Sequence, residues 1–417
     1  MAGLLIKKFL PFWIFLVFFK FAGALHYSLI SSFGGQLLPL WIVGLFMGGS
    51  SVVQLLLDVP AGHIMDRYGY QLFLLVTTAI FFAATVCYCF GLTLVTYVIS
   101  IVLSTFGWLF FGPGINAYVL SHSNQATAGR FMSLRDVTGS IGVVLSSIVL
   151  PLALIMSPTL VGWILSISFV ASFAALCFAP KDRMVATAEE KISSQHFYLR
   201  RHSLVKALGV INRLNPASGM LVVSGFAAGV FYGSVWFVLP LVMASKTNSF
   251  ALGLGLGIFD FAVVVLGWAL GVLADRFNRR MLVFFGLLVF AVSASMTGFS
   301  FSWVFLIFGF LATTGDEISS LSLWAWLHNL DKDHANDGAV SGIISVFSDA
   351  GWAVGPMIAG FVYGILGPTW TIILSSLPIF AAWIAYQTVL HGHSPQFLQN
   401  TQGITVPPKP HRPRHRS

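Results

Sequence analysis

The segment GHIMDRYG at residues 62–69 has a counterpart, GVLADRFNRR, at residues 271–280. Half of the 417-residue chain separates the two segments, and each follows one long apolar run and precedes the next. Membrane proteins that arose by duplication show such internal symmetry between their two halves. A charged turn at the same place in both halves therefore indicates a duplicated bundle of membrane helices, with a moving part at the turn.

The composition places the chain in a lipid bilayer. Hydrophobic residues make up 57% of the chain, charged residues only 9%, and the mean hydropathy is +0.86. Soluble domains carry about 25% charged residues, so this chain has too few polar side chains to cover a surface in water. Its apolar runs reach the roughly 20 residues that a spanning helix needs and lack the alternation of strands. The sequence predicts an all-α integral membrane protein.

Twelve apolar runs are candidates for membrane-spanning helices. They cover residues 9–31, 38–60, 71–92, 94–120, 133–155, 159–179, 217–243, 250–271, 281–300, 303–328, 339–366 and 369–390. With the N-terminus inside, every Lys and Arg except Lys20 and Lys246 falls on the inner side. Inner loops are enriched in these residues, so we expect both termini in the cytoplasm and the protein in the cell (inner or plasma) membrane. The net charge of +8 then reflects this bias, and we expect no nucleic acid partner.

A polar stretch near the middle divides the twelve runs into two sets of six. We expect an N-terminal six-helix bundle at residues 1–180, a cytoplasmic linker at 181–216, a C-terminal six-helix bundle at 217–390 and a disordered basic cytoplasmic tail at 391–417. The tail could instead contact anionic lipid. The first run also resembles a signal peptide, but Lys20 interrupts it, so we interpret it as a retained helix.

The similarity between the halves extends beyond the opening pair of segments. Phe21-Ala22 followed by Tyr27 is similar to Phe226-Ala227 followed by Tyr232, and Asp136 with Gly142 is similar to Asp349 with Gly355. The spacing between matching positions drifts by a few residues, as expected where loops differ in length. Two parallel halves related by an axis normal to the membrane occur in transporters.

With these motifs the chain resembles the major facilitator superfamily of secondary transporters, over essentially its whole length. The family's loop signature after the second helix of each half reads Gly-x-Leu-Ala-Asp-Arg-x-Gly-Arg-Arg/Lys. The first half matches at Gly62, Asp66, Arg67 and Gly69, with Asp58 in an acidic-x-Pro pattern upstream, and the second half matches at Gly271, Leu273, Ala274, Asp275, Arg276, Arg279 and Arg280. The resemblance implies twelve helices in two pseudo-symmetric six-helix bundles, alternating access, and an inner gate at these residues.

The two copies of the signature are unequal. Tyr70 and Gln71 stand in the first copy where the family usually has basic residues, and Asn278 replaces Gly in the second. Because Asn tolerates positive φ, we expect the second turn to keep its form. An acid at a helix end can cap a neighbouring helix or pair with Arg, and we favour gating over a simple cap. Neutralising Asp275, whose copy keeps two arginines, is expected to disturb transport more than neutralising Asp66.

Five charged residues fall well inside predicted membrane helices, away from the ends of the runs: Lys20, Asp260, Asp316, Glu317 and Asp349. A charge at the bilayer centre costs on the order of 2.5–3.5 kcal/mol on insertion scales, and such residues are functional by default. Burial favours a protonated carboxyl group and a nearby cation favours the carboxylate, so an acid can take up a proton and release it elsewhere. We predict proton coupling at Asp316 and Glu317, with Lys20 as their counter-ion or as a contact for an anionic substrate. A static ion network is the alternative, and Asp260 and Asp349 fit either interpretation.

Aromatic residues supply weaker signals. Tyr27, Tyr232, Trp236 and Trp324 are candidates to line a substrate cavity, although packing or anchoring at the membrane interface explains them as well. We interpret the Gly-x-x-x-Gly pattern at residues 351–355 as a site of close helix packing.

No Walker motif, dinucleotide loop or metal-ligand spacing is present in the sequence, so we expect no enzyme activity, no cofactor and no metal. The expected partners are a small-molecule substrate, protons and the lipid bilayer, and we expect a monomer. The sequence predicts a proton-coupled secondary active transporter, with export of a drug or metabolite as the first expectation. Proton-linked uptake or uniport is an alternative, and a non-transporting sensor or scaffold on the same fold is an alternative of another class.

Overall fold

The computed structural model describes residues 9–122, 128–181, 216–245, 250–299, 301–330 and 337–392. Nearly all of the predicted linker and of the predicted tail lies outside these residues. Within the described ranges every regular element is an α-helix. The local structure therefore agrees with a chain whose backbone hydrogen bonds must be satisfied within each segment.

The helices follow the apolar runs of the sequence. In chain order they are α2 (Leu10–Leu37), α3 (Leu40–Tyr68), α4 (Tyr70–Cys89), α5 (Leu94–Ser121), α6 (Ala128–Ile155), α7 (Pro158–Cys177), α10 (Pro216–Ser245), α11 (Phe250–Arg276), α12 (Arg279–Thr297), α13 (Trp303–Leu330) and α14 (Asp337–Gly392). Ten segments in the described part of the chain are long and apolar enough to span a membrane, and α11 adds a shorter apolar stretch at Gly253–Gly267. The structure confirms an all-helical multi-pass membrane protein, and the count of twelve spans stays a prediction.

The longest element, α14, consists of two helical arms. They meet at Gly367, where φ is 78° and ψ is 179°. A positive φ is accessible to glycine without strain, and Pro368 follows directly, so the chain can turn here and start a new helix. The arms correspond to the predicted runs 339–366 and 369–390.

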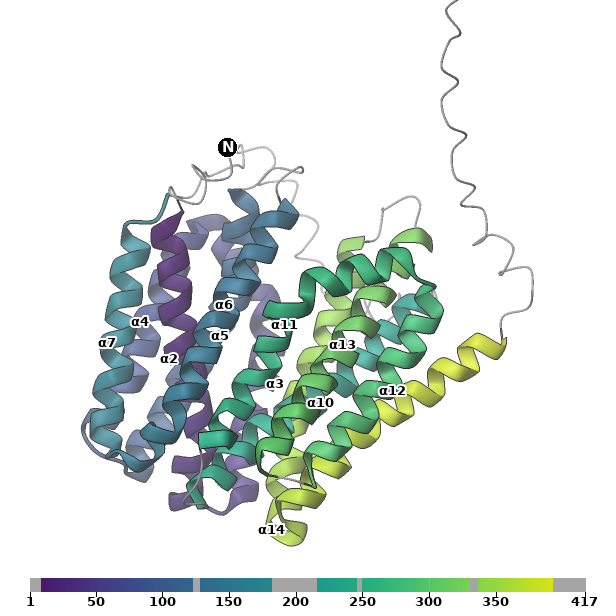
Figure 1. Ribbon diagram of the computed structural model, residues 1–417. Helices are drawn as coiled ribbons and strands as arrows, with labels where there is room; N and C mark the ends of the chain where they lie inside the picture. Colours follow the sequence, from purple (N-terminus) through teal and green to yellow (C-terminus); the bar gives the residue numbers. More distant parts are fainter. Residues whose placement is uncertain are drawn as a thin grey trace, which may run out of the picture.

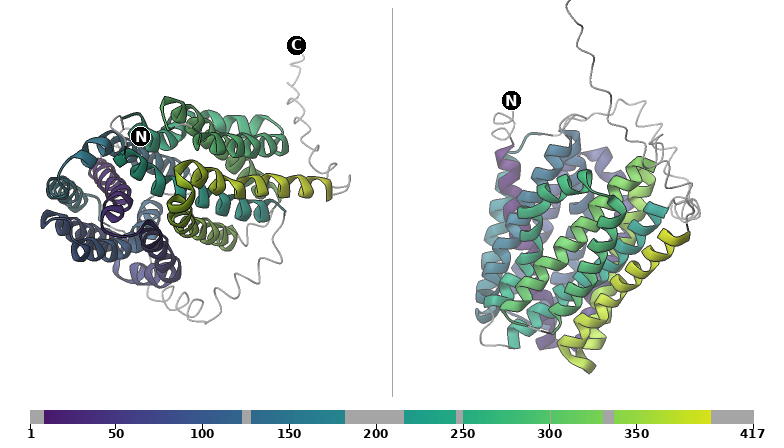
Figure 2. Two further views of the ribbon diagram at one scale, coloured as in Figure 1. Left: turned by 90° about the horizontal axis from the view of Figure 1, so that it is seen from below. Right: turned by 45° about the vertical axis from the view of Figure 1, so that its right-hand side comes forward.

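Figure 1 shows the helices lying side by side, with α2 and α4–α7 on one side of the molecule and α10 and α12–α14 on the other. Helices from the first half of the sequence contact helices from the second half mainly in three places, α2 against α10, α3 against α14 and α6 against α11, and α6 also contacts α10. Figure 2 gives two further views of this arrangement. The interface between the two sets of helices is thus built from a few matched pairs.

Glycines bring two of these pairs into very close contact. Gly48 of α3 lies against the backbone carbonyl of Ala353 in α14, and Gly253 of α11 lies against the ring of Pro151 in α6. A Cβ atom at either glycine would overlap its neighbour, so no larger residue fits without moving a helix. Further glycines of the same contacts are Gly44 and Gly360 on the first pair and Gly257 on the second. We name these α3–α14 and α6–α11 contacts the glycine seams.

The Gly-x-x-x-Gly pattern in α14 packs against α10. Gly351 lies against the carbonyl of Phe226 and Gly355 against the carbonyl of Val230. The hydroxyl of Ser234 in α10 donates a hydrogen bond of 3.0 Å to the carbonyl of Gly355. These contacts confirm the interpretation of the pattern as a site of close helix packing.

Each of the two signature turns joins one helix to the next, but their backbone conformations differ. Gly69 joins α3 to α4 with φ of 98°. Asn278 instead has φ of −63° and ψ of 107° and caps α12, because its side-chain oxygen accepts a hydrogen bond from the backbone N–H of Arg280 at 3.0 Å. The expectation that Asn278 preserves a positive-φ turn is therefore wrong. Asn is suited to this place as a helix N-cap.

Candidate functional site

A cavity of about 780 Å³ lies among α2, α3, α5, α6, α10, α11, α13 and α14. Its wall combines charged and aromatic side chains. The charged residues are Lys20, Arg135, Asp136, Asp260, Glu317 and Asp349, and the aromatic residues are Tyr27, Trp108, Phe111, Trp236 and Trp352. Sites for small molecules have volumes of roughly 300–1,000 Å³, so the space is large enough for a solute.

The cavity extends toward the end of the bundle at which α2 begins. Leu16 near the start of α2, Asn116 near the end of α5 and Arg135 near the start of α6 all belong to its wall. The glycine seams lie toward the opposite end, where α3 and α11 begin. Backbone packing therefore confines the cavity on one side.

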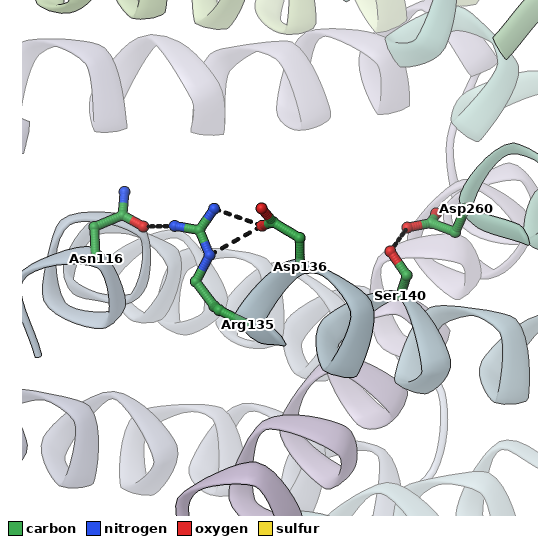
Figure 3. A network of polar contacts seen from close by, with 5 residues as sticks. All are labelled: Asn116, Arg135, Asp136, Ser140 and Asp260. Carbon is green, nitrogen blue, oxygen red and sulfur yellow. Dashed lines mark hydrogen bonds and ion pairs between the residues drawn. The ribbon is translucent and has the colours of Figure 1, made fainter. Parts of the chain in front are cut away.

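Arg135 is fixed in the wall by two neighbours (Figure 3). Its Nε donates a hydrogen bond of 2.9 Å to Oδ1 of Asp136, and its Nη1 donates to Oδ1 of Asn116 on α5. Arg135 and Asp136 form an ion pair, and it is the only one found between side chains in the described ranges. The pair neutralises its own charges and links α5 to α6.

Asp260 connects α11 with helices of the first half. The hydroxyl of Ser140 in α6 donates a hydrogen bond of 2.8 Å to Oδ1 of Asp260 (Figure 3). Asp260 is also the main electrostatic attraction acting on Lys20 of α2. The Nζ atom of Lys20 lies 5.7 Å from the ring centroid of Trp108 and 5.2 Å from that of Phe111, within the range of cation–π attraction. The main acidic partner of Lys20 is therefore Asp260, and not the predicted pair in α13.

The two adjacent acids of α13 face different surroundings. Glu317 belongs to the cavity wall, whereas Asp316 does not. Tyr232 of α10 donates a hydrogen bond of 2.9 Å to Oδ2 of Asp316. The ring of Tyr232 stacks on that of Trp352, with centroids 6.5 Å apart, and Trp352 does line the cavity. Asp316 therefore does not line the cavity itself but is connected to its wall through Tyr232 and Trp352.

The aromatic residues predicted to line a substrate cavity also differ in position, because some belong to the cavity wall and others do not. Tyr27 and Trp236 line the cavity and meet edge to face, with ring centroids 5.9 Å apart. Tyr232 lies behind the wall with its bonded acid. Trp324 is not part of the wall, and 38% of its side chain is exposed. Asp349 joins Trp352 on one face of α14, since the two are three residues apart in a helix.

Only some of the predicted gating residues have described side chains. Arg67 lies with its guanidinium 5.4 Å from the ring of Tyr68. Arg279 donates a hydrogen bond of 2.8 Å to the carbonyl of Ala325, so it fastens the start of α12 to α13. Arg280 lies over the ring of Trp326 at 5.7 Å. The side chains of Asp58, Gly62, Asp66, Gly271, Asp275 and Arg276 lie outside the described residues, and their gating role stays a prediction.

In each half of the sequence, a hydrogen bond joins the start of one helix to a residue near the end of the last helix of that half. In the first half, Nε2 of Gln71 at the start of α4 donates a hydrogen bond of 2.9 Å to the carbonyl of Leu176 near the end of α7. In the second half, the hydroxyl of Tyr386 near the end of α14 donates a hydrogen bond of 3.0 Å to the carbonyl of Arg280 at the start of α12. Gln71, which departs from the basic residue of the family signature, therefore still makes a contact between helices.

Sequence reasoning missed several polar residues of the wall: Asn116, Arg135, Asp136 and Ser140. The predicted run begins at residue 133, which places Arg135 among the charges of the inner surface. The helix in fact begins at Ala128, which places Arg135 and Asp136 more than one turn inside it. The spacing of Asp136, Gly139, Ser140 and Val143 was an available signal, because positions three and four apart share one helix face.

Comparisons with known proteins agree with this architecture. A family model described as Major Facilitator Superfamily matches residues 221–410. No curated protein sequence matches the chain. Among solved structures, the human organic anion transporter MFSD10 (TETRAN) is 14% identical, with 91% of this chain and 97% of that chain covered and a TM-score of 0.58.

Two further structures are of POT family transporters. One, in complex with a thioalcohol conjugated peptide, is 12% identical, with 94% of this chain and 96% of that chain covered and a TM-score of 0.67. Another, in complex with 5-aminolevulinic acid, has the same identity and coverage and a TM-score of 0.65. At these identities the likeness concerns the fold. The family match covers residues 221–410, and the likeness of fold extends along nearly the whole chain, in agreement with the resemblance of its motifs to the major facilitator superfamily.

Proposed function

We propose that the protein is a secondary active transporter that moves a small solute across the membrane by alternating access. The charged cavity, confined by the glycine seams at one end, is the observation that carries this proposal. A solute in such a space can leave toward one side only until the helices around it rearrange. We count twelve membrane spans for this transporter, with α11 as one span and the arms of α14 as two.

The conformation corresponds to an inward-facing state in this proposal. The distribution of Lys and Arg along the sequence assigns the start of α2 to the cytoplasm. The cavity extends toward that side, and the glycine seams would then close the outer side. An outward-facing state requires α3 to part from α14 and α6 to part from α11.

Protons are the proposed coupling ion, with Glu317 as the principal acceptor. Glu317 lies in the cavity wall, where a proton can reach it from water, and it interacts electrostatically with Asp316, Asp136 and Asp260. The adjacent Asp316, outside the cavity wall, accepts a hydrogen bond from Tyr232, and this bond helps to hold α13 against α10. A buried carboxyl group that gains and loses a proton changes the charge of the cavity, and this change can alter which conformation is favoured.

Transport in proteoliposomes tests the coupling. A thermal-stabilisation screen on the purified protein first identifies a ligand, and uptake of that ligand is then followed with and without an imposed pH gradient. We expect gradient-driven accumulation by the wild type and a loss of it, with downhill exchange retained, in Glu317→Gln. Trp163→Phe, on an exposed face of α7, serves as the control. Unchanged gradient-driven flux in both Glu317→Gln and Asp316→Asn would remove the coupling assignment.

The same vesicles separate the alternative functions. We propose export of a drug or metabolite, by a monomer in the cell membrane, and accumulation inside inverted vesicles driven by an acidic lumen fits that direction. Accumulation with the opposite gradient would instead indicate proton-linked uptake, and flux insensitive to the gradient would indicate a uniporter. A ligand that binds but does not cross in either gradient would favour a sensor on the same fold.

A further inference from the structure

The charges in the cavity wall do not balance. Two cations face four carboxyl groups, the cations being Lys20 and Arg135 and the acids being Asp136, Asp260, Glu317 and Asp349. Charges removed from water are unfavourable unless a partner compensates them. The excess of acids therefore needs either bound protons or a counter-charge that the wall itself does not contain.

Each cation already has its own acid. Arg135 is paired with Asp136, and its remaining Nη1 contact is to an amide oxygen. Lys20 is attracted mainly by Asp260. Neither Glu317 nor Asp349 has a hydrogen bond or ion pair with another side chain in the part of the chain that the structure describes. These two acids, on α13 and α14, are the unbalanced ones.

The surroundings of Glu317 add to this imbalance. Its electrostatic interactions are with three other acids, Asp136, Asp260 and Asp316. Like charges at short range repel more strongly in a medium of low dielectric constant than in water. A positive charge placed beside Glu317 would relieve this repulsion, whereas a negative charge would increase it.

A second, independent feature is the aromatic surface next to these acids. Trp352 lies on the same face of α14 as Asp349, and Tyr27 and Trp236 meet edge to face in the same cavity. Aromatic faces attract organic cations through the ring quadrupole, most strongly in Trp. The cavity thus offers both a carboxylate group and an aromatic surface to the same ligand.

From this geometry we propose that the solute is an organic cation with an aromatic or apolar body. Its positive head contacts the acidic part of the cavity wall that contains Glu317 and Asp349, and its body lies against Trp352, Trp236 and Tyr27. The proposal deepens the transport function above and rests on it. A proton and the cation would occupy the same carboxylates, so the two would exclude each other there.

Matched ligands test the charge preference. Phenyltrimethylammonium, benzenesulfonate and phenylalanine share one aromatic ring and differ in charge, and the first is charged at every pH. Calorimetric titration of the purified full-length protein should show binding of phenyltrimethylammonium and at least about tenfold weaker binding of the other two, since a charge-assisted contact is gained in one case only. Equal or tighter binding of benzenesulfonate or phenylalanine, or no binding of phenyltrimethylammonium at millimolar concentration, would overturn the proposal.

Variants locate the site. Glu317→Gln and Asp349→Asn should each weaken phenyltrimethylammonium binding about tenfold, and Glu317→Asp should restore most of it because the charge returns. Trp352→Leu should weaken binding by about threefold, the effect of one lost cation–π contact. Trp163→Phe, outside the cavity, should change nothing. Unchanged affinity in both neutralised variants, with their thermal stability intact, would contradict the assignment, and Trp352→Leu tests it separately if a neutralised variant does not fold.

A flux measurement distinguishes the two levels of the proposal. Proteoliposomes are loaded with phenyltrimethylammonium, and its exit is measured under either pH gradient. Specific binding without exit would keep the cation site and overturn the transport function. Exit of benzenesulfonate but not of phenyltrimethylammonium would keep transport and overturn the cation site.

Discussion

The side chain of Ser140 in α6 donates a hydrogen bond to Asp260 in α11, which lies 120 residues further along the chain. Asp260 also attracts Lys20 of α2, so this carboxylate interacts with two helices of the other half of the sequence. A hydrogen bond to a charged group contributes roughly 1.5–3 kcal/mol, more than a bond between neutral groups. This one side chain therefore couples the cavity to the contact between α6 and α11.

We predict that Ser140→Ala lowers the free energy of unfolding of the purified protein by roughly 1–3 kcal/mol, because Asp260 loses its hydrogen-bond donor. Ser146→Ala is the matched control, since within the described residues the hydroxyl of Ser146 donates its hydrogen bond to the carbonyl of Val143 in its own helix. Thermal unfolding of both variants, and of each combined with Asp260→Asn, measures the coupling. Equal destabilisation by the two serine variants, or additivity of Ser140→Ala with Asp260→Asn, would contradict the prediction.

The candidate site was only partly predictable from residues alone. Charged residues within apolar runs are visible in a sequence, and four of the five found in this way line the cavity: Lys20, Asp260, Glu317 and Asp349. Adjacent acids such as Asp316 and Glu317 cannot be separated without the rotation of their helix. Electrostatic attraction across helices, as of Lys20 by Asp260, depends on tertiary packing that no local pattern specifies.

At the scale of elements, the α3–α14 seam depends on the absence of side chains. Gly48 leaves no room for a Cβ against Ala353 of α14, whereas the next residue, Gly49, has open space around it. Two glycines in succession on one helix therefore have different roles. The first permits close approach of two helices, and the second does not contact the partner.

Gly48→Ala is predicted to push α3 away from α14 and so to favour the conformation in which the seam is open. Gly49→Ala should leave the conformational balance unchanged and add helix stability of roughly 0.5–1 kcal/mol. A cysteine at Gln54 of the cavity wall, in a background without the native cysteines, reports the change through a membrane-impermeant maleimide. Faster labelling from the outer side in Gly48→Ala alone is the expected result, and similar rates in both variants would argue against it.

Helix positions followed well from the apolar runs, while helix ends did not. The run predicted at 38–60 belongs to a helix that continues to Tyr68, and the run at 250–271 to one that continues to Arg276. Hydrophobicity records the part of a helix in lipid, but backbone hydrogen bonding persists into the polar interface. The ends are fixed by local signals instead, such as Gly69 and the Asn278 cap.

At the scale of the whole molecule, the chain's basic residues predict its orientation. Phe90, in the turn after α4, and Phe277, between α11 and α12, are both exposed, at 80% and 62%. By the positive-inside rule the first lies outside and the second inside. In a background without the native cysteines, an impermeant thiol reagent applied to intact cells should label Phe90→Cys and not Phe277→Cys, and the reverse pattern would invert the assigned topology.

The glycine seams have a consequence for how each side of the protein responds to its surroundings. The contacts at the glycines are made by backbone and uncharged side chains, whereas Asp260, which bonds across the same α6–α11 contact, lies in the cavity wall. None of the glycines can be protonated, phosphorylated or screened by ions. Closure of that end should be insensitive to salt concentration, since screening acts on charges. Any dependence of the cycle on ionic strength would then arise in the charged cavity and at the opposite end of the bundle. One end of the molecule would then respond to the ionic strength of the solution, and the other end would close by packing of uncharged groups.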